Sequence, residues 1–341
     1  MKPLNWSIIG LGRFGRIHAD TLRGMPGIQL DWACSRNAEL LNHHATELDL
    51  TKTTTDYQDI LNDPSVDVVS ITTHWEDHYQ ITLDALESGK HVLLEKPMAA
   101  TAQQCAEITA CSKRNPGKFM VGHICRFDAR YVLAREAIQA GQIGNVTSIH
   151  ARRNLPVAPG NIRLDKISPL IGDGIHDLDL AMWILGRPPN SVFAHNTRIH
   201  DYQYPDISWA LFDFNQNDSS QGTVVVIETN WALPANTPTV IDARMEINGT
   251  TGQITVDCST AGLKVQTLEG TQFKDTIYWP RVHEQNTGVL RSELEYFANC
   301  IRSDETVEVI TADEAGLAVE MILLAEQSAA TGKIVSCSSP I

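Results

Sequence analysis

A glycine pattern within the first fifteen residues constrains this chain more than any other feature. Gly10, Gly12 and Gly15 form a G-x-G-x-x-G motif. The apolar run Trp6–Ile9 precedes the motif as a short buried strand, and a helix is expected from Ile17 onward. Glycines at this spacing allow a tight turn, close approach of the backbone to a pyrophosphate, and a helix N-terminus directed at its charge. Because the motif lies between a strand and a helix, it favours a dinucleotide-binding unit over the alternative of an unrelated glycine-rich turn.

Strands and helices alternate along the first third of the chain. The later expected strands are apolar runs bounded by turn residues: Ile28–Cys34, Val66–Ile71, His91–Glu95 and Lys118–Val121. One helix between them should end near Gly89, and Thr101 with Gln104 forms a capping box for another that reaches about Arg114. Parallel neighbours need crossover helices, so the alternation predicts a parallel, doubly wound Rossmann sheet. Ligands of such sheets collect beyond the carboxyl ends of the strands.

The candidate cofactor-binding residues lie at this edge of the predicted sheet. They are Gly10, Gly12, Arg13, Phe14, Gly15, Ser35, Arg36, Thr72, Thr73, His78, Glu95, Lys96, Pro97 and His123. Lys96 draws particular attention because an ammonium group at the mouth of a buried strand has no obvious packing role. A functional group at the rim and a salt bridge to Glu95 are the two interpretations of this lysine.

The end of the second strand bears on which dinucleotide binds. An acidic residue about 20 positions after the third glycine would bind the ribose 2′-hydroxyl of NAD. Here that position is Ser35, followed by Arg36, and neither is acidic. Both could contact a 2′-phosphate, so the sequence favours NADP over NAD. The alternative is that Arg36 is a solvated loop charge and the adenosine is held by other groups.

The pattern changes after about residue 125, so we predict domains at 1–124 and 125–341. A helix is expected at about Tyr131–Ala140. Successive β-like stretches then dominate: Val146–Arg153, Ser191–Ile199, Ile207–Phe214, Thr223–Trp231, Asp242–Ile247, Gln253–Asp257 and Gly262–Gln266. They predict an α+β domain with a large, open, mostly antiparallel sheet. The apolar run 223–227 needs a cover of helices or of a partner subunit. Two helices, at about 287–301 and 311–330, close the chain.

One helical segment interrupts these strands and carries polar groups at its start. The pattern predicts a helix from Ile175 to Gly186, with His176 and Asp177 in the first turn and Asp173 just before it. Aspartates in this place have a structural explanation, since they cap a helix and complement its dipole. A charged histidine gains nothing from the dipole there, so His176 is either a core residue or part of a functional site.

The composition excludes several classes of function. The net charge is −14 with no cluster of Lys or Arg, which argues against nucleic acid and anionic membranes as partners. No apolar run reaches the length of a membrane span. The seven cysteines are scattered and form no C-x-x-C pair, so we expect no metal site, and reduced thiols favour a cytoplasmic protein.

Together these motifs resemble the glucose–fructose oxidoreductase / inositol dehydrogenase / MocA family. The similarity rests on the glycine motif and on three blocks, GKHVLLEKPMA, GHICRFD and GIHDLDLAMWILG, and runs through the chain. It implies that Lys96 handles a proton, that the Lys96–Pro97 bond is cis, that His176 is catalytic and that Arg126 holds substrate. It also implies an open sheet that builds homodimers or homotetramers. The family often has an aspartate four residues before the histidine. Here that residue is Gly172, and Asp173 either replaces the aspartate, caps the helix or serves a variant site.

The expected function is therefore NAD(P)-dependent oxidation of a secondary alcohol, or reduction of the ketone, on a sugar, inositol or related polyol. Lys96 is the general acid/base, with His176 and Asp173 as further catalytic candidates. The candidates for substrate binding, besides Arg126, are Arg152, Asn154, Asp177 and Trp231. Two alternatives remain open: a regulator that binds the cofactor without catalysis, and an enzyme with tightly bound NAD that runs an internal redox cycle for glycoside cleavage or transhydrogenation.

Overall fold

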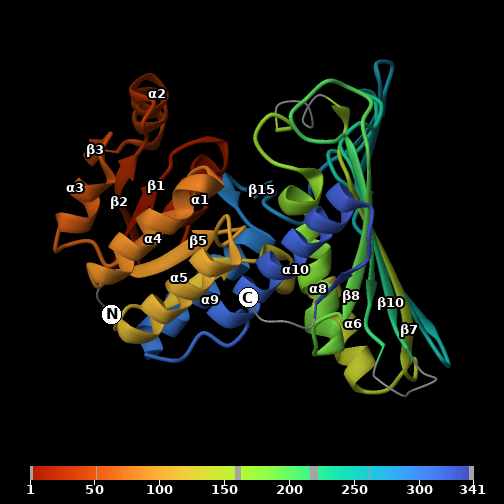
Figure 1. Cartoon of the computed structure of the whole chain (residues 1–341). Helices are drawn as coiled ribbons and strands as arrows, with labels where there is room; N and C mark the ends of the chain where they lie inside the picture. The colour runs from red at the N-terminus through yellow and green to blue at the C-terminus, as the bar shows by residue number, and fades with distance from the viewer. Residues whose placement is uncertain (1–2, 51, 158–162, 216–221, 261, 338–341) are drawn as a thin grey trace. The chain divides into compact units, whose positions relative to one another are not determined.

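The chain forms two compact units. The computed structural model describes residues 3–50, 52–157, 163–215, 222–260 and 262–337 (Figure 1). The first unit comprises Met1–Phe127 and Ile277–Gly316, and the second comprises Asp128–Thr276 and Leu317–Ile341. The sequence suggested one division, at 124/125, and did not assign the segment 277–316 to the N-terminal unit. That segment packs there through its helix, since Phe297 meets Trp6 edge to face with ring centroids 6.0 Å apart.

The first unit is built on a six-stranded sheet in which all neighbouring strands are parallel, in the order β3-β2-β1-β4-β5-β6. Its strands are β1 (Leu4–Ile9), β2 (Ile28–Cys34), β3 (Lys52–Thr54), β4 (Val68–Ile71), β5 (His91–Glu95) and β6 (Phe119–Gly122). The central strands β4 and β5 are almost fully buried, as expected for a sheet covered on both faces. The predicted parallel Rossmann sheet is therefore confirmed, with β3 as a strand that the sequence analysis did not identify.

The first unit contains helices between these strands and one helix, α9, from the later segment 277–316. They are α1 (Arg13–Arg23), α2 (Ala38–Leu48), α3 (Tyr57–Asn62), α4 (His78–Glu87), α5 (Ala102–Arg114) and α9 (Val289–Ser303), with short 3₁₀ turns η1 (Trp75–Asp77) and η2 (Ile124–Phe127). The predicted cap of α5 is present, because Thr101 Oγ1 accepts a hydrogen bond from the Gln104 amide at 3.1 Å. Gln104 Oε1 in turn accepts from the Ala100 amide at 3.1 Å. These caps fix where α5 begins after the β5 loop.

The second unit contains a seven-stranded sheet in the order β12-β11-β7-β10-β9-β8-β17. Its strands are β7 (Val146–Asn154), β8 (Ser191–Thr197), β9 (Ile207–Asp213), β10 (Val224–Asn230), β11 (Asp242–Gly249), β12 (Gln253–Asp257) and β17 (Val335–Ser336). The β7–β10 pair is parallel, and the other neighbouring pairs are antiparallel. This confirms the predicted α+β unit with a mostly antiparallel sheet.

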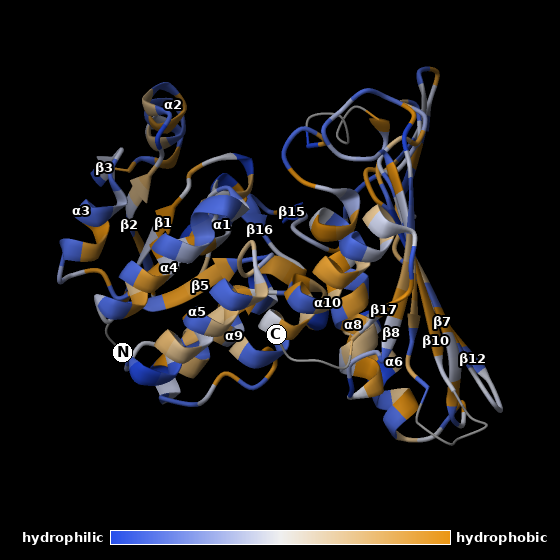
Figure 2. Cartoon of the chain, viewed as in Figure 1, coloured by the Kyte–Doolittle hydropathy of each residue, from blue (hydrophilic) through white to orange (hydrophobic). Residues whose placement is uncertain are grey.

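Helices cover one face of this sheet. They are α6 (Ala129–Gln139), α8 (Ile175–Leu185) and the later part of α10 (Ala312–Thr331) (Figure 1). A π-helical turn, Leu170–Gly174, leads into α8, which contacts β7 and β10. The Ala194 amide of β8 donates to Ser328 Oγ of α10 at 2.9 Å. Apolar residues concentrate on the strands, while the helices carry both polar and apolar residues (Figure 2).

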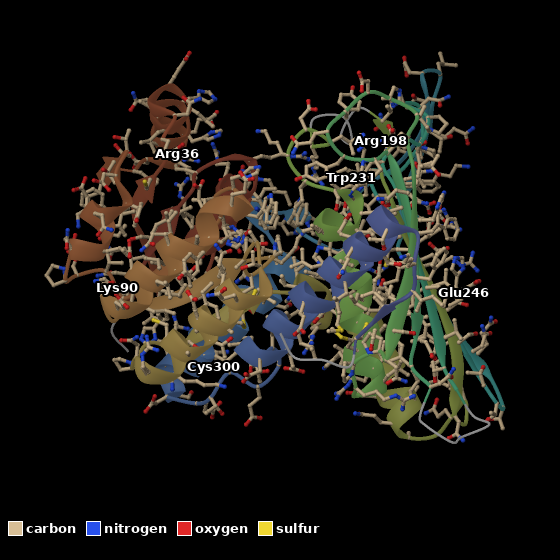
Figure 3. The ribbon with its side chains drawn as sticks, in the orientation of Figure 1. Arg36, Lys90, Arg198, Trp231, Glu246 and Cys300 are labelled. Carbon is tan, nitrogen blue, oxygen red and sulfur yellow. The ribbon has the colours of Figure 1, made fainter. Side chains whose placement is uncertain are left out.

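No described element of the second unit covers the opposite face of the sheet. Strands β8 and β9 alternate buried and exposed residues, as expected when only one face is covered. The exposed positions include Phe193, Trp209 and Leu211, which are 42%, 41% and 43% exposed. Figure 3 shows Glu246 of β11 on this face, on the side away from α8 and α10. We refer to this surface as the open face.

Two small hairpins outside the main sheets differ from the sequence prediction. The predicted strand Gly262–Gln266 is β13 (Lys264–Thr267), which pairs with β14 (Gly270–Phe273) in a hairpin separate from the main sheet. A second small hairpin, β15 (Arg281–Val282) with β16 (Gln285–Asn286), belongs to the first unit. Among the residues described, no helix combines the length and apolar character that a membrane span needs.

Candidate functional site

The glycine loop adopts the geometry that a pyrophosphate requires. Gly10 has φ +105°, and a Cβ there would lie 2.6 Å from the Thr73 amide nitrogen. A Cβ at Gly15 would lie 2.2 Å from the Gly10 carbonyl oxygen, so α1 can approach the loop this closely only at a glycine. A Cβ at Gly12 would meet no described atom within 4 Å, which leaves its backbone open to a ligand. The three glycines thus fit the turn, phosphate and packing roles of a dinucleotide-binding loop.

Two neighbouring strands hold this loop in place. The Cys34 carbonyl at the end of β2 accepts from the Gly10 and Leu11 amides at 2.9 and 2.8 Å. On the other side, Thr72 Oγ1 donates to the Gly10 carbonyl at 2.8 Å. Gly12 caps α1 without a side-chain hydrogen bond, and the first turn of α1 carries no acidic residue. The N-terminus of α1 therefore keeps amide donors and a positive dipole end for an anion.

The residues after β2 are already engaged by other groups of the first unit. Ser35 Oγ accepts from the Asn37 amide at 3.3 Å. Arg36 Nη2 pairs with Asp77 Oδ2 at 2.6 Å, and the Arg36 side chain is 79% exposed (Figure 3). Asp77 ends the η1 turn that follows β4. A guanidinium matched with a carboxylate offers less to a 2′-phosphate than an unmatched one, which weakens the sequence argument for NADP.

Lys96 follows a buried acidic residue at the carboxyl end of β5. Glu95 Oε2 accepts from the Lys96 amide at 3.3 Å, and His18 Nε2 of α1 donates to Glu95 Oε1 at 3.2 Å. Glu95 and His18 are 8% and 0% exposed. The Lys96–Pro97 bond is cis, as the family resemblance implied. Glu95 therefore positions the backbone of the lysine loop, while the Lys96 side chain is half-buried.

His78 locks the other side of the same loop. Its Nδ1 donates to the Pro97 carbonyl at 2.8 Å, and Nε2 lies 3.3 Å from the Thr73 carbonyl. A neutral ring donates to one of these two carbonyls, and the shorter contact favours Nδ1 as the donor. His78 is 1% exposed, and this burial lowers the pKa of its imidazole. We assign it to holding the β4 and β5 loops together, which supports the cofactor site without a proton-transfer role.

A further buried carboxyl group lies behind Glu95. Glu293 of α9 is 0% exposed, and neither of its carboxyl oxygens has a hydrogen-bond partner among the described residues. Burial, and then the Glu95 carboxylate, raise the pKa of Glu293 well above its ordinary value. The sequence analysis did not identify this residue, because nothing in the pattern of α9 distinguishes it from a surface glutamate.

Two predicted residues at the end of β6 are deeply buried in the first unit. His123 is 0% exposed and Arg126 is 3% exposed. Arg126 Nη1 donates to the Val309 carbonyl at 2.8 Å and pairs with Glu314 Oε1 at 3.1 Å. This guanidinium therefore connects the β6 loop to Val309 and to the first turn of α10. The sequence predicted a substrate contact for Arg126 and did not predict this structural role.

In the second unit, Asp173 is held by an indole. Trp231 Nε1 donates to Asp173 Oδ2 at 2.9 Å, and Arg163 Nη1 lies 3.8 Å from the same oxygen. Trp231 is 0% exposed and packs with Leu155 and Leu164. The predicted contact of this ring with a substrate does not fit its burial, whereas orientation of Asp173 does.

His176 and Asp177 lie in the first turn of α8 with different surroundings. His176 is 7% exposed. Asp177 is 1% exposed and forms a two-point ion pair with Arg153 of β7, through Nη2–Oδ1 at 2.8 Å and Nε–Oδ2 at 3.3 Å. Burial raises the pKa of Asp177, and Arg153 counteracts this shift. Asp177 therefore joins α8 to the sheet, so its predicted binding of a substrate hydroxyl is less well supported.

Two other predicted substrate residues, Arg152 and Asn154, lie on the face of the sheet opposite to α8. Along β7, Ile149, Ala151 and Arg153 are buried beneath α8, which directs Arg152 to the open face. There Arg152 Nη2 pairs with Asp242 Oδ1 at 3.1 Å. Asn154 Nδ2 donates to Glu228 Oε1 at 2.9 Å. Neither side chain is on the α8 side with His176, so the structure does not bring these two predicted substrate residues together with that histidine.

The comparison with known families matches both units. The family described as an oxidoreductase family with an NAD-binding Rossmann fold matches residues 4–123, and the GFO/IDH/MocA C-terminal domain matches residues 131–255. The chain belongs to the GFO/IDH/MocA oxidoreductase family. It is thus an oxidoreductase with a nicotinamide dinucleotide-binding domain, as the glycine loop indicates.

Individual members of the GFO/IDH/MocA family resemble the chain over most of its length. It is 28% identical over 334 residues to a scyllo-inositol 2-dehydrogenase (NAD(+)) of Bacillus subtilis, covering 96% of this chain and 94% of that protein. It is 32% identical over 203 residues to an inositol 2-dehydrogenase of Salmonella typhimurium, covering 57% of this chain and 58% of the relative. A solved scyllo-inositol dehydrogenase of Lactobacillus casei, with bound NAD(H) and scyllo-inositol, shares the fold with TM-score 0.82 at 23% identity, covering 99% and 100% of the chains.

These members do not support the preference for NADP that we drew from Ser35 and Arg36. The Bacillus subtilis relative is named for NAD, and the Lactobacillus casei structure holds NAD(H). The prediction of NADP rested on the charge of Arg36. Its partner Asp77 lies 41 residues later and could not be recognised from the local pattern.

The departure at position 172 also has a physical explanation in this GFO/IDH/MocA chain. A Cβ at Gly172 would lie 2.6 Å from Trp231 Cη2 and 2.7 Å from Cζ2. The Trp231 ring thus occupies the space that a side chain at 172 would need, and the same ring hydrogen-bonds Asp173. Sequence reasoning identified the shifted aspartate but not the tryptophan that accompanies it.

Proposed function

We propose that this chain is an NAD-dependent dehydrogenase that transfers hydride between the nicotinamide and a secondary alcohol or ketone of an inositol, a sugar or a related polyol. The geometry of the Gly10–Gly15 loop is the observation that carries the proposal. The loop fits a pyrophosphate, and the carboxyl ends of β2, β4 and β5 extend the cofactor site along one edge of the sheet. The names of the inositol dehydrogenases that resemble the chain support the substrate class.

Residues of the first unit would hold the dinucleotide. The glycine loop and the N-terminus of α1 would bind the pyrophosphate, and the residues after β2 would face the adenosine ribose. Thr72, Thr73 and His78 support the loops after β4 and β5. When bound, the nicotinamide supplies or accepts the hydride.

Lys96 is the proposed general acid/base. Oxidation of a carbinol requires a base for the hydroxyl proton, and reduction of a ketone requires an acid for the same oxygen. The ammonium group at the end of β5 is in the part of the sheet where ligands of this fold bind. Its loop is held by Glu95, which accepts from the Lys96 amide, and by His78, which bonds the Pro97 carbonyl. His18 in turn holds Glu95 through a buried hydrogen bond. Such fixed positioning of a proton-transfer group is what general catalysis requires.

His176 is the proposed partner of Lys96 in handling the proton or in hydrogen-bonding the reacting oxygen. It comes from the second unit, at the start of α8. Asp173, oriented by Trp231, is the proposed acidic group near this histidine in sequence. Arg126 stays a candidate for substrate contact, although Glu314 and the Val309 carbonyl already engage one of its nitrogens.

The preference for NAD rests on two observations. Arg36 is paired with Asp77, and the named relatives use NAD. The alternatives from the sequence, a regulator without catalysis and an internal redox cycle, gain no support from these relatives. A dehydrogenase needs side chains that transfer a proton, such as Lys96 and His176, whereas a regulator without catalysis does not.

A lysine substitution tests the proposal. Lys96→Met should bind NADH with an affinity within threefold of that of the parent. Its turnover rate with inositols, aldoses or ketosugars should fall by a factor of about 10²–10⁴. Lys113→Met is the matched control, because Lys113 is exposed on α5 and pairs only with the equally exposed Asp313 among the described contacts. Full turnover in Lys96→Met would refute the assignment of Lys96.

The open face supports a proposed homodimer or homotetramer. An apolar group with Phe193, Trp209 and Leu211 would be covered by a second copy of the chain. Sedimentation of the parent and of Trp209→Glu tests this, since the charge should dissociate the assembly. All seven cysteines are buried thiols, which supports the proposed cytoplasmic location.

A further inference from the structure

We propose that Asp77 is a specificity-determining residue that disfavours a 2′-phosphate on the cofactor by holding Arg36. The inference rests on the proposed function, because it assumes that a nicotinamide dinucleotide binds at the glycine loop. It goes further by assigning the choice between NAD and NADP to an ion pair rather than to the residue after β2 alone.

The position of Arg36 follows from the backbone of the first unit. The Cys34 carbonyl accepts from both Gly10 and Leu11, so β2 ends against the glycine loop. Ser35 and Arg36 leave the sheet at that point. In a Rossmann unit the residues after the second strand face the adenosine ribose, where NAD carries a hydroxyl and NADP a phosphate. Arg36 is therefore placed to meet the group that distinguishes the two cofactors.

Asp77 accepts hydrogen bonds from the same guanidinium nitrogens of Arg36 that a 2′-phosphate would bind. Arg36 Nη2 lies 2.6 Å from Asp77 Oδ2, and Nη1 lies 3.5 Å from Oδ1. Two guanidinium nitrogens thus face the two carboxylate oxygens, the arrangement in which arginine also binds phosphate oxygens. A 2′-phosphate would have to replace this carboxylate or share the guanidinium with it.

The other charges near the end of β2 act in the same direction. Asp56 caps α3, and Asp59 accepts a hydrogen bond from Thr54 at the end of β3. Burial, followed by these two carboxylates, raises the pKa of the Cys34 thiol to about 11, while Arg36 acts in the opposite sense. Asp56, Asp59 and Arg36 thus all lie within electrostatic range of the Cys34 thiol at the end of β2. Carboxylates in this place repel a phosphate dianion and leave a neutral ribose hydroxyl unaffected.

The pair is a modest obstacle rather than an absolute one. The Arg36 and Asp77 side chains are 79% and 32% exposed. Ion pairs in such surroundings are weak and exchange readily with solvent or ligand. Removal of the carboxylate frees the guanidinium and also removes a negative charge beside the 2′-phosphate. The NADPH affinity should therefore rise by about tenfold and not by several orders of magnitude.

The test compares NADH and NADPH binding by fluorescence titration of the full chain. Asp77→Asn should tighten NADPH binding about tenfold while changing NADH binding less than threefold. Glu76→Gln is the matched control, because it removes the same charge one residue away, and the structure pairs Glu76 with His74 rather than Arg36. The control should change either affinity less than threefold. An equal effect of the two substitutions would overturn the proposal.

A second background tests whether Asp77 acts through Arg36. In Arg36→Ala, the further change Asp77→Asn should improve NADPH binding less than threefold, because no guanidinium is released. A full tenfold gain there would contradict the pairing mechanism. Failure of the parent chain to bind either dinucleotide would instead refute the proposed function, so the two results are distinguishable.

Discussion

The buried carboxyl of Glu293 makes a quantitative prediction about stability. Its side chain is fully buried on α9, neither oxygen has a hydrogen-bond partner among the described residues, and the Glu95 carboxylate lies nearby. Burial disfavours the charged form most, and Glu95 adds to this, so the pKa of Glu293 is raised well above 4.5. We expect Glu293 to be protonated in the folded chain under conditions where it is ionised in the unfolded chain.

The sign of the pH dependence follows from proton linkage. Above pH 4.5 the unfolded chain releases this proton while the folded chain keeps it, so the folded state binds more protons. The contribution of Glu293 to the free energy of unfolding is therefore largest below that pH and falls as pH rises towards the folded pKa. The slope is about 1.4 kcal/mol per pH unit for one proton. Glu293→Gln removes this slope, because the amide resembles the neutral acid and does not titrate.

Urea unfolding at a series of pH values measures this difference. Between pH 5 and pH 6, the free energy of unfolding of Glu293→Gln minus that of the parent should rise by about 1 kcal/mol, because the unfolded glutamate is not yet fully ionised at pH 5. Glu305→Gln, at an exposed glutamate just after α9, is the control and should show no such trend. A difference that stays constant with pH would refute a raised pKa at Glu293. A difference that falls would mean that Glu293 is stabilised as a carboxylate.

Two further predictions concern the second unit. Gly172→Ala should lower the free energy of unfolding by about 1–3 kcal/mol, because its Cβ would press on the rigid Trp231 ring, whereas Gly174→Ala meets side-chain methyl groups at 3.2 Å or more and should cost less. Thermal unfolding of both variants checks this, and equal costs would contradict it. Asp177→Ala should cost about 3–5 kcal/mol by leaving Arg153 buried without its carboxylate, and Asp177→Leu combined with Arg153→Met should recover much of the loss. Failure of the double variant to recover any stability in denaturant titrations would count against this account.

Local sequence patterns were sufficient to predict the backbone plan of both units. The glycine motif and the alternation of strands identified the parallel sheet, because each signal depends on residues close in sequence. The helix from Ile175 to Gly186 was predicted for the same reason, and Gly186 does end it with φ 68°. The segment 277–316 was not assigned to the first unit, because the contact of Phe297 with Trp6 joins the two ends of the chain.

The site was less predictable wherever function depends on a partner distant in sequence. The charge of Arg36 suggested NADP, but its partner Asp77 lies 41 residues later. The sequence left three roles open for Asp173, and its hydrogen-bond donor Trp231 lies 58 residues later. The placement of Arg152 could have been predicted from the sequence. The alternation of side chains along β7 places Arg153, with Ala151, on the covered face and Arg152 on the open one.

A double-mutant cycle on kcat/KM tests the central claim most directly, which is that Lys96 and His176 serve one proton transfer. Lys96→Met, His176→Ala and the double variant are compared with the parent on an inositol substrate, with NADH binding measured in each. We expect the double variant to lose about as much activity as Lys96→Met alone, because the effects of groups that act as a unit are not additive. Multiplied losses, or unchanged activity in His176→Ala, would contradict it.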